Sequence, residues 1–321
     1  MKKKVILLLL ILVISAFFFI PVNREKTTLI KSSFLNIYGL LANPLYWEKW
    51  RPELRNAIKT DSDKILVTKD STSFRIKYTN LSLGVKFGGT TFEIKDTTAR
   101  KNTNYSYTLI PVNDKFQNKT DIVVVENTNV LNYLCGMIWP PSFSGTHIDD
   151  FKNFMETDSL RYGFKIFKTG VPESNLIVIR REVLKANKFT EAAKMLATLK
   201  QHIKANNIKQ IYPVIAQFLP KGKDSSQVNV GFFIDKEVAS NNEIIFTRMP
   251  KGGPLFAAKF KGEFSKRGKA YVALNQYFID YTHQTAILPF ETYLDNKLPH
   301  SDNDIINIQV NFSTYPSDSV K

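Results

Sequence analysis

Hydrophobic and polar residues alternate along much of the first half of the chain. This period of two, typical of strands with one buried face, runs through residues 64–69, 73–79, 81–86, 91–95, 105–111 and 121–126. The pattern before these strands predicts short helical segments over residues 33–55, and residues 147–156 regain a helical period after them. Helices, antiparallel strands and a late helix together predict an α+β layer over residues 24–160.

The second half, residues 161–321, repeats one order of elements. A strand, an amphipathic helix and two strands are predicted first at residues 175–183, 189–203, 212–219 and 228–235, and again at 255–264, 270–281, 287–294 and 306–315. Pro213 and Pro289 stand at matching points. We therefore expect a duplicated βαββ fold with a pseudo-two-fold axis, with both helices on one side of the sheets and a cleft between the halves.

An uncharged apolar run follows three lysines at the N-terminus and covers residues 5–20. As a helix, residues 5–22 nearly cross a hydrocarbon core, and the lysines can snorkel to the interface. A cleaved signal peptide has the same charged start, but this run ends in bulky residues where cleavage needs small ones. We expect residues 1–23 to be an uncleaved, single-pass transmembrane signal anchor in the inner membrane. The positive-inside rule then predicts that the later residues lie on the non-cytoplasmic side.

Composition and the absence of known motifs exclude several kinds of partner and site. The net charge is +15, but the basic residues are scattered and no helix-turn-helix, zinc-finger or RNA-binding motif accompanies them, so no direct nucleic-acid partner is expected. Cys135 is the single cysteine, which excludes an intrachain disulfide and a thiolate metal cluster. The four histidines are isolated, and no nucleophile elbow, Walker loop or dinucleotide fingerprint is present. We predict no metal and no cofactor.

The first domain resembles the START-like (SRPBCC, polyketide cyclase and lipid-transport) superfamily. The residues that carry this resemblance are the segments 44–50 and 149–156, together with the order of the elements. The resemblance implies a curved sheet wrapped around a C-terminal helix over a hydrophobic cavity, and hence an apolar ligand. Trp47 and Trp50, three residues apart, are interpreted as core residues of one helix face.

The second domain resembles the GyrI-like, or bacterial transcription-activator effector-binding, family. Segments 249–254, 260–262 and 289–294 carry the resemblance, and the last, Pro-Phe-Glu-Thr-Tyr-Leu, is the most specific. The family implies that drug-like, often cationic or aromatic molecules bind between the two halves, facing a carboxylate from this segment. That role maps onto Glu291.

Strand alternation places Glu291 and Tyr293 on the same face of their strand. A carboxylate beside an aromatic ring suits a cation, through Coulomb attraction and the ring quadrupole. Ile215 and Gln217 are the matching positions of the first half, so we expect a single, asymmetric site. The alternative is that Glu291 and Tyr293 simply occupy a solvent-facing side of the strand.

These patterns favour a membrane-anchored small-molecule-binding protein, a sensor or sequestering protein whose ligand is amphipathic, aromatic or cationic. One alternative is a hydrolase of small electrophilic compounds that uses Glu291 and Tyr293, although a binding role is favoured over an enzymatic one. Another is a carrier of lipids or other hydrophobic ligands through the START-like domain. A transcription regulator would need a separate DNA-binding partner.

Overall fold

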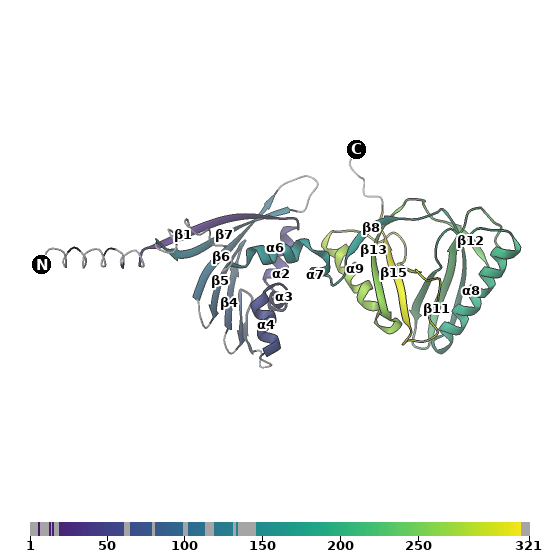
Figure 1. Cartoon of the computed structure of the whole chain (residues 1–321), viewed down its shortest axis with the longest axis horizontal. Coiled ribbons are helices and arrows are strands. Elements are labelled where there is room, and N and C mark those ends of the chain that lie inside the picture. Colours follow the sequence, from purple (N-terminus) through teal and green to yellow (C-terminus); the bar gives the residue numbers. More distant parts are fainter. Residues whose placement is uncertain are drawn as a thin grey trace. The chain divides into compact units, whose positions relative to one another are not determined.

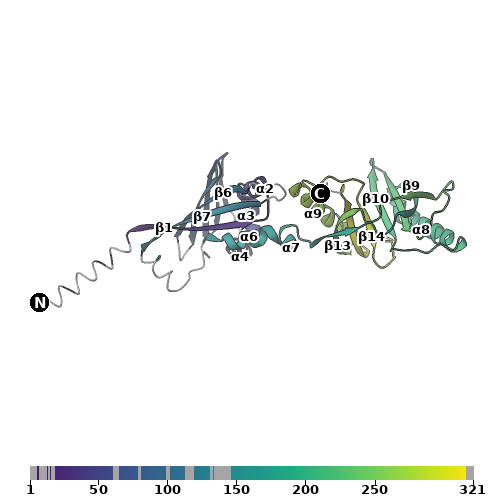
Figure 2. The ribbon, with the colours of Figure 1, turned by 90° about the horizontal axis from the view of Figure 1, so that it is seen from above.

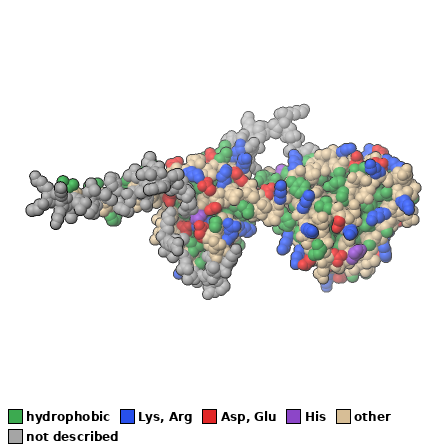
Figure 3. All heavy atoms as spheres, in the orientation of Figure 1, with side chains coloured by type: hydrophobic (Ala, Val, Ile, Leu, Met, Phe, Trp, Pro, Cys, Tyr) green, Lys and Arg blue, Asp and Glu red, His purple; other side chains and the backbone are tan. Residues whose placement is uncertain are grey.

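The structure is a computed structural model that describes residues 6, 13, 15, 19–60, 65–78, 81–98, 102–112, 119–130, 133 and 146–315. Cys135 lies outside the described residues. The chain divides into two compact units, Met1–Arg161 and Tyr162–Lys321, and each is described by itself. Lys and Arg side chains are scattered over the visible face of Tyr162–Lys321 and are mixed with acidic ones (Figure 3).

The first unit is built on a seven-stranded antiparallel sheet in the order β1-β7-β6-β5-β4-β3-β2. The strands are β1 (Pro21–Ile30), β2 (Ile65–Lys69), β3 (Ser73–Tyr78), β4 (Leu81–Gly88), β5 (Thr91–Thr98), β6 (Asn102–Val112) and β7 (Lys119–Asn129). From β2 to β7 each strand pairs with the next along the chain, while β1 closes the far edge against β7. The alternation of apolar and polar residues therefore predicted every strand of this sheet except β1.

Helices cover one face of this sheet (Figures 1 and 2). They are α2 (Phe34–Leu41), α3 (Pro44–Trp50), α4 (Pro52–Thr60) and α6 (Ile148–Glu156), and the short α7 (Asp158–Arg161) follows with no buried residue. Asn43 caps α3 by accepting a hydrogen bond from the backbone N–H of Leu45, and Pro44 fits the first turn. Trp47 and Trp50 are buried, and Trp50 packs edge-on against Phe151 of α6, which confirms their predicted core role.

The predicted N-terminal transmembrane helix is wrong. Among the described residues, no helix is both long enough and apolar enough to cross a membrane. Pro21 and Val22, which were counted as the end of that helix, belong instead to β1, where they pair with Asn129 and Thr128. Exposure alternates along β1 as in an edge strand with one covered face. Most of residues 5–20 lie outside the described part, and the localisation inferred from them stays a prediction.

The second unit is built on one eight-stranded antiparallel sheet in the order β12-β9-β11-β10-β14-β15-β13-β8. Its strands are β8 (Ile166–Gly170), β9 (Asn175–Leu184), β10 (Ile215–Lys221), β11 (Ser225–Phe233), β12 (Ile245–Arg248), β13 (Pro254–Glu263), β14 (Phe290–Tyr293) and β15 (Ile305–Ser313). Its helices are the short η2 (Lys185–Asn187) and η3 (Phe264–Lys266) and the longer α8 (Lys188–Ala205) and α9 (Gly268–Asp280). Both units combine helices with an antiparallel sheet and therefore belong to the predicted α+β class.

The repeat seen in the sequence is present, but each half has one more strand than predicted. β8 and β12 precede the two halves, and each pairs with the outer strand of the other half, β8 with β13 and β12 with β9. The halves also join edge to edge through β10 and β14. The two halves therefore form one continuous sheet and not two separate ones.

Both long helices pack on the same face of that sheet, as predicted. The apolar cluster on this face takes Met195 and Leu199 from α8 and Leu274 and Phe278 from α9. A smaller cluster on the opposite face includes Phe290 of β14. Figure 1 shows α8 beside β11 and α9 beside β13 and β15.

Candidate functional site

Glu291 and Tyr293 lie on β14, all four residues of which are buried. Tyr293 belongs to the apolar cluster beneath the helices, whereas Phe290 belongs to the cluster on the opposite face, so the strand alternates as its sequence predicts. Only 1% of Glu291 is exposed and none of Tyr293. The alternative of a solvent-facing side for these two residues is therefore wrong.

Three donors surround the Glu291 carboxylate. Arg267 Nε donates to Oε1 at 2.7 Å and Tyr271 OH donates to the same oxygen at 2.9 Å, while Tyr293 OH donates to Oε2 at 2.5 Å. A guanidinium and two hydroxyls therefore supply the hydrogen bonds of this buried carboxylate. Burial, and after it the neighbouring carboxylate, raises the pKa of the Tyr271 and Tyr293 phenols well above the usual value. Both phenols therefore remain protonated donors at neutral pH.

Arg267 enters the site from the junction between η3 and α9. Its guanidinium carbon lies 3.5 Å from the centre of the Phe264 ring, and Nη1 donates to the Phe264 carbonyl at 3.2 Å. The side chain is 20% exposed, so the guanidinium borders solvent while its other edge reaches the buried carboxylate. Arg267 and Tyr271 were not among the predicted site residues, because they lie on another element and the only local signal was a basic residue ahead of a helix.

Several aromatic side chains pack together next to Arg267. Phe264 packs edge-on against Phe189 and Phe218, at centroid distances of 5.1 and 5.2 Å. The Lys188 ammonium lies 4.5 Å from the centre of the Phe189 ring and 5.5 Å from that of Phe264. Two protein cations thus already lie on these ring faces, which is the placement that cation–π attraction favours.

The sheet register defines which residues of the two halves are equivalent. η2 and η3 begin directly after β9 and β13, so Leu184 and Glu263 occupy the same position in their halves. Leu184 pairs with Ser225 of β11, and Glu263 pairs with Ile305 of β15. Three residues after Ser225 on β11, Val228 pairs with Phe218 of β10. Three residues after Ile305 on β15, Ile308 pairs with Tyr293 of β14, so Phe218 and Tyr293 are equivalent.

The same register makes Ala216 the equivalent of Glu291, two residues before Phe218 and Tyr293. The predicted equivalents, Ile215 and Gln217, are wrong by one residue. Because side chains alternate along a strand, this shift places them on the opposite face of the sheet. The expected asymmetry remains, since alanine and phenylalanine stand where the second half has the acid and the phenol.

That opposite face carries a cavity of about 340 Å³ where β10 and β14 meet, lined in part by Ile215, Gln217 and Phe290. Gln217 accepts a hydrogen bond from Asn229 Nδ2 at 2.6 Å and donates to the carbonyl of Pro289 at 2.9 Å. A hollow therefore does lie at the seam between the halves, but Glu291 and Tyr293 point to the other side of the sheet. Within the described residues, no group of three or more His, Cys, Asp or Glu is placed to hold a metal ion.

Neither a protein-family model nor a curated protein matches the chain. Among solved structures, the C-terminal domain of EcmrR matches at 18% identity and a TM-score of 0.39, over 47% of this chain and 96% of that one. A START superfamily protein from Mycobacterium smegmatis matches at 10% identity and a TM-score of 0.29, over 42% and 97%. The Aha1 dimer from Colwellia psychrerythraea matches at 16% identity and a TM-score of 0.28, over 42% and 96%.

The structural neighbours thus include the C-terminal domain of EcmrR and a protein of the START superfamily. Every one of these matches has an identity below 20% and a TM-score below 0.5. None of them assigns a ligand or an activity to this chain.

Proposed function

We propose that residues 162–321 form a non-catalytic binding module for a small organic cation, which takes the place of Arg267 against Glu291. One observation carries this proposal. A fully buried carboxylate is held by the protein's own planar cation, and the central carbon of that cation lies over an aromatic ring. A guanidinium that lies over Phe264 and is bonded to Glu291 makes the contacts that an amidinium or aromatic ammonium ligand would make.

Burial explains why an internal cation is needed. An unpaired carboxylate in this environment would cost several kcal/mol, so a neighbouring positive charge stabilises Glu291 in the folded module. Arg267 supplies that charge in the structure described. Because a fifth of its side chain reaches solvent, the arginine can leave towards water while a ligand takes over the ring and the carboxylate.

The hydrogen bonds at Glu291 favour binding over hydrolysis. A general base needs a carboxylate free to accept a proton, and a nucleophile needs an unencumbered oxygen. Here Oε1 accepts two hydrogen bonds and Oε2 accepts one from Tyr293. The phenols themselves are held protonated by burial beside the carboxylate.

Equilibrium titration of the full chain with benzamidine and with tetraphenylphosphonium tests the proposal. Benzamidine matches the planar charge of Arg267, and tetraphenylphosphonium supplies a bulky apolar cation. Arg267→Met removes the internal competitor, so affinity for the preferred cation should rise about tenfold, the equivalent of 1.4 kcal/mol. Lys266→Met is the matched control, since it removes an adjacent cation that pairs with Glu263 instead.

Glu291→Gln alone should show no increase in cation affinity over wild type. Combined with Arg267→Met, it should abolish the increase that Arg267→Met produces. Thermal unfolding of each variant, with and without ligand, separates lost binding from lost folding. Equal affinities for wild type, Arg267→Met and Glu291→Gln would overturn the proposal. Turnover of an electrophilic substrate that disappears in Glu291→Gln while binding survives would establish the hydrolase alternative.

A further inference from the structure

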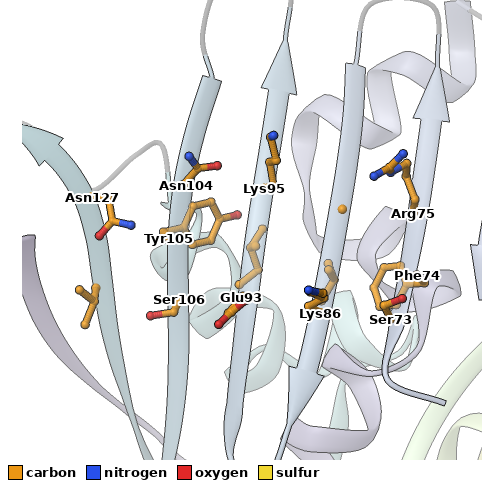
Figure 4. A pocket seen from close by; sticks show the side chains of 14 residues that line it. Ser73, Phe74, Arg75, Lys86, Glu93, Lys95, Asn104, Tyr105, Ser106 and Asn127 are labelled. Carbon is orange, nitrogen blue, oxygen red and sulfur yellow. The ribbon is translucent and has the colours of Figure 1, made fainter. Parts of the chain in front are cut away.

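The first unit carries a hollow on the face of its sheet that the helices leave uncovered. The hollow has a volume of about 630 Å³ and crosses strands β3 to β7 (Figure 4). Its floor is the backbone of Phe74, Val85, Ile94 and Tyr105, whose buried side chains belong to the core on the other face. Its walls are therefore formed by the residues between them, which point outward.

The strand register arranges these outward residues in two rows across the sheet. In the first row, Arg75 pairs with Gly84, Gly84 with Lys95, and Lys95 with Asn104. Neighbouring strands lie roughly 4.8 Å apart, so the Cα atoms of Arg75 and Lys95 are separated by about 10 Å, with Gly84 between them. The parallel row consists of Ser73, Lys86, Glu93, Ser106 and Val125.

Gly84 opens the hollow at its centre. A Cβ at this position would lie 3.9 Å from the carbonyl oxygen of Lys95 and 4.0 Å from Nε of Arg75. A side chain there would therefore occupy the space between the two cations. Figure 4 shows Arg75 and Lys95 on the two strands that flank the strand of Lys86, and the register places Gly84 between them.

The hollow has a surplus of positive charge. Arg75, Lys86 and Lys95 face one acid, Glu93, which leaves two net positive charges. Across the described ranges, none of the three cations forms a hydrogen bond or an ion pair within the protein, and all three are exposed. An anion placed over Gly84 would meet Arg75 and Lys95 without breaking an existing bond.

The remaining lining groups define the rest of the ligand. Asn104, Asn127, Ser73 and Ser106 offer amide and hydroxyl groups that can donate and accept hydrogen bonds. The rings of Phe74 and Tyr105 point into the core, so neither offers the stacking surface that bases use on single-strand-binding proteins. A volume of this size accommodates a monosaccharide or disaccharide.

We propose that this hollow binds a hydroxyl-rich molecule that carries one anionic group, a phosphorylated or carboxylated sugar, with the anion over Gly84 between Arg75 and Lys95. The hydroxyl groups then lie along the asparagines and serines. This site belongs to residues 1–161 alone and does not depend on the cation site proposed for the other unit.

Calorimetric titration of the full chain at low ionic strength tests the proposal with four probes: glucose 6-phosphate, glucuronate, glucose and inorganic phosphate. At least one of the two acidic sugars should bind, and it should bind more tightly than glucose or phosphate alone. Which acidic sugar binds more tightly tells phosphate from carboxylate. Because the charges are exposed, raising the salt concentration should weaken binding.

Two matched pairs of variants locate the site. Lys95→Gln should lower the affinity about fivefold, whereas Lys77→Gln, which removes an exposed charge from the same sheet outside the hollow, should leave it unchanged. Gly84→Thr should lower the affinity more than tenfold by filling the centre, since a threonine suits a strand and the Cβ distances are ordinary contacts. Gly88→Thr, on the same strand where a Cβ meets nothing within 4 Å, is its control.

The proposal is overturned if neither acidic sugar binds the wild-type chain. It is also overturned if Lys77→Gln weakens binding as much as Lys95→Gln, because binding would then follow net charge instead of this hollow. Unchanged affinity in a folded Gly84→Thr variant would overturn it as well.

Discussion

Each unit pairs an arginine with a buried carboxylate, and the two pairs differ in how completely their polar atoms are hydrogen-bonded. In residues 162–321, Glu291 accepts from Arg267 and two phenols, and Arg267 borders solvent. In residues 1–161, Arg51 is fully buried and its Nη2 donates to Asp96 Oδ2. Arg51 Nε and Nη1 and Asp96 Oδ1 have no hydrogen-bond partner among the described residues.

An arginine–carboxylate pair has a different energetic role in each unit. The Arg267–Glu291 pair has a route to water, so its cation can be exchanged at modest cost. The Arg51–Asp96 pair has none, and each unmet polar atom adds a desolvation penalty. We expect the first pair to be exchangeable and the second to be structural.

Breaking the Arg51 pair should produce the largest effect. Arg51→Met leaves Asp96 buried without its cation and should lower the free energy of unfolding of this unit by about 3–5 kcal/mol. All three tryptophans of the chain lie in residues 1–161, so tryptophan fluorescence during urea unfolding follows this unit. The double variant Arg51→Met, Asp96→Leu should recover most of the loss, because it removes both charges. A single Arg51→Met variant as stable as wild type would contradict a structural role.

Replacing a buried tyrosine by phenylalanine should have an effect of intermediate size that differs between the two units. The Tyr293 hydroxyl donates to Glu291, whereas the buried Tyr105 hydroxyl has no partner of hydrogen-bond geometry in the described part of the chain. Tyr293→Phe should cost about 1.5–3 kcal/mol, since it removes a hydrogen bond to a charged group. Tyr105→Phe should change stability by less than about 0.5 kcal/mol or increase it. Hydrogen exchange followed by mass spectrometry measures both units separately, and equal costs would contradict the assignment.

A pH dependence should give the smallest effect. His147 lies beside Arg51, with Nδ1 3.2 Å from Asp150 Oδ2 and 3.6 Å from Glu53 Oε2, and Nε2 3.9 Å from Asp96 Oδ2. Burial first, and then the Arg51 charge, lowers the pKa of the His147 imidazole below its usual value. The unfolded state therefore binds the proton first as pH falls, so this unit should lose stability from about pH 6.5 downward until the folded-state pKa is passed.

His147→Asn isolates that contribution. His147 has a positive φ of 55°, a conformation that asparagine tolerates better than most residues, so the backbone is preserved while the titrating group is removed. The variant should show a flatter stability profile between pH 7 and pH 5 in tryptophan-monitored unfolding. The exposed His300→Asn serves as the control. An unchanged slope in His147→Asn would show that other groups govern this range.

Local patterns predicted much of the fold. Side chains on the buried face of a strand or helix must contact the core, and this sets the spacing of apolar residues. That spacing predicted the strands at 73–78 and 121–126, the helix that ends near residue 156, and the repeat in the second half. Glu291 and Tyr293 share a face for the same reason, and their neighbour Phe290 faces the other way. These properties depend on spacing within a single segment, which the sequence states directly.

Tertiary structure decided what depends on pairing between distant segments. An apolar run predicted a membrane helix, yet Pro21 and Val22 extend an edge strand against β7 because a partner strand was available there. The registers of β10 with β11 and of β14 with β15 made Ala216, and not Ile215, the equivalent of Glu291. The Glu291 carboxylate binds a cation because Arg267, which lies on another element, reaches it. Sequence spacing fixes which side a residue faces along its own strand, and only folding determines what it meets there.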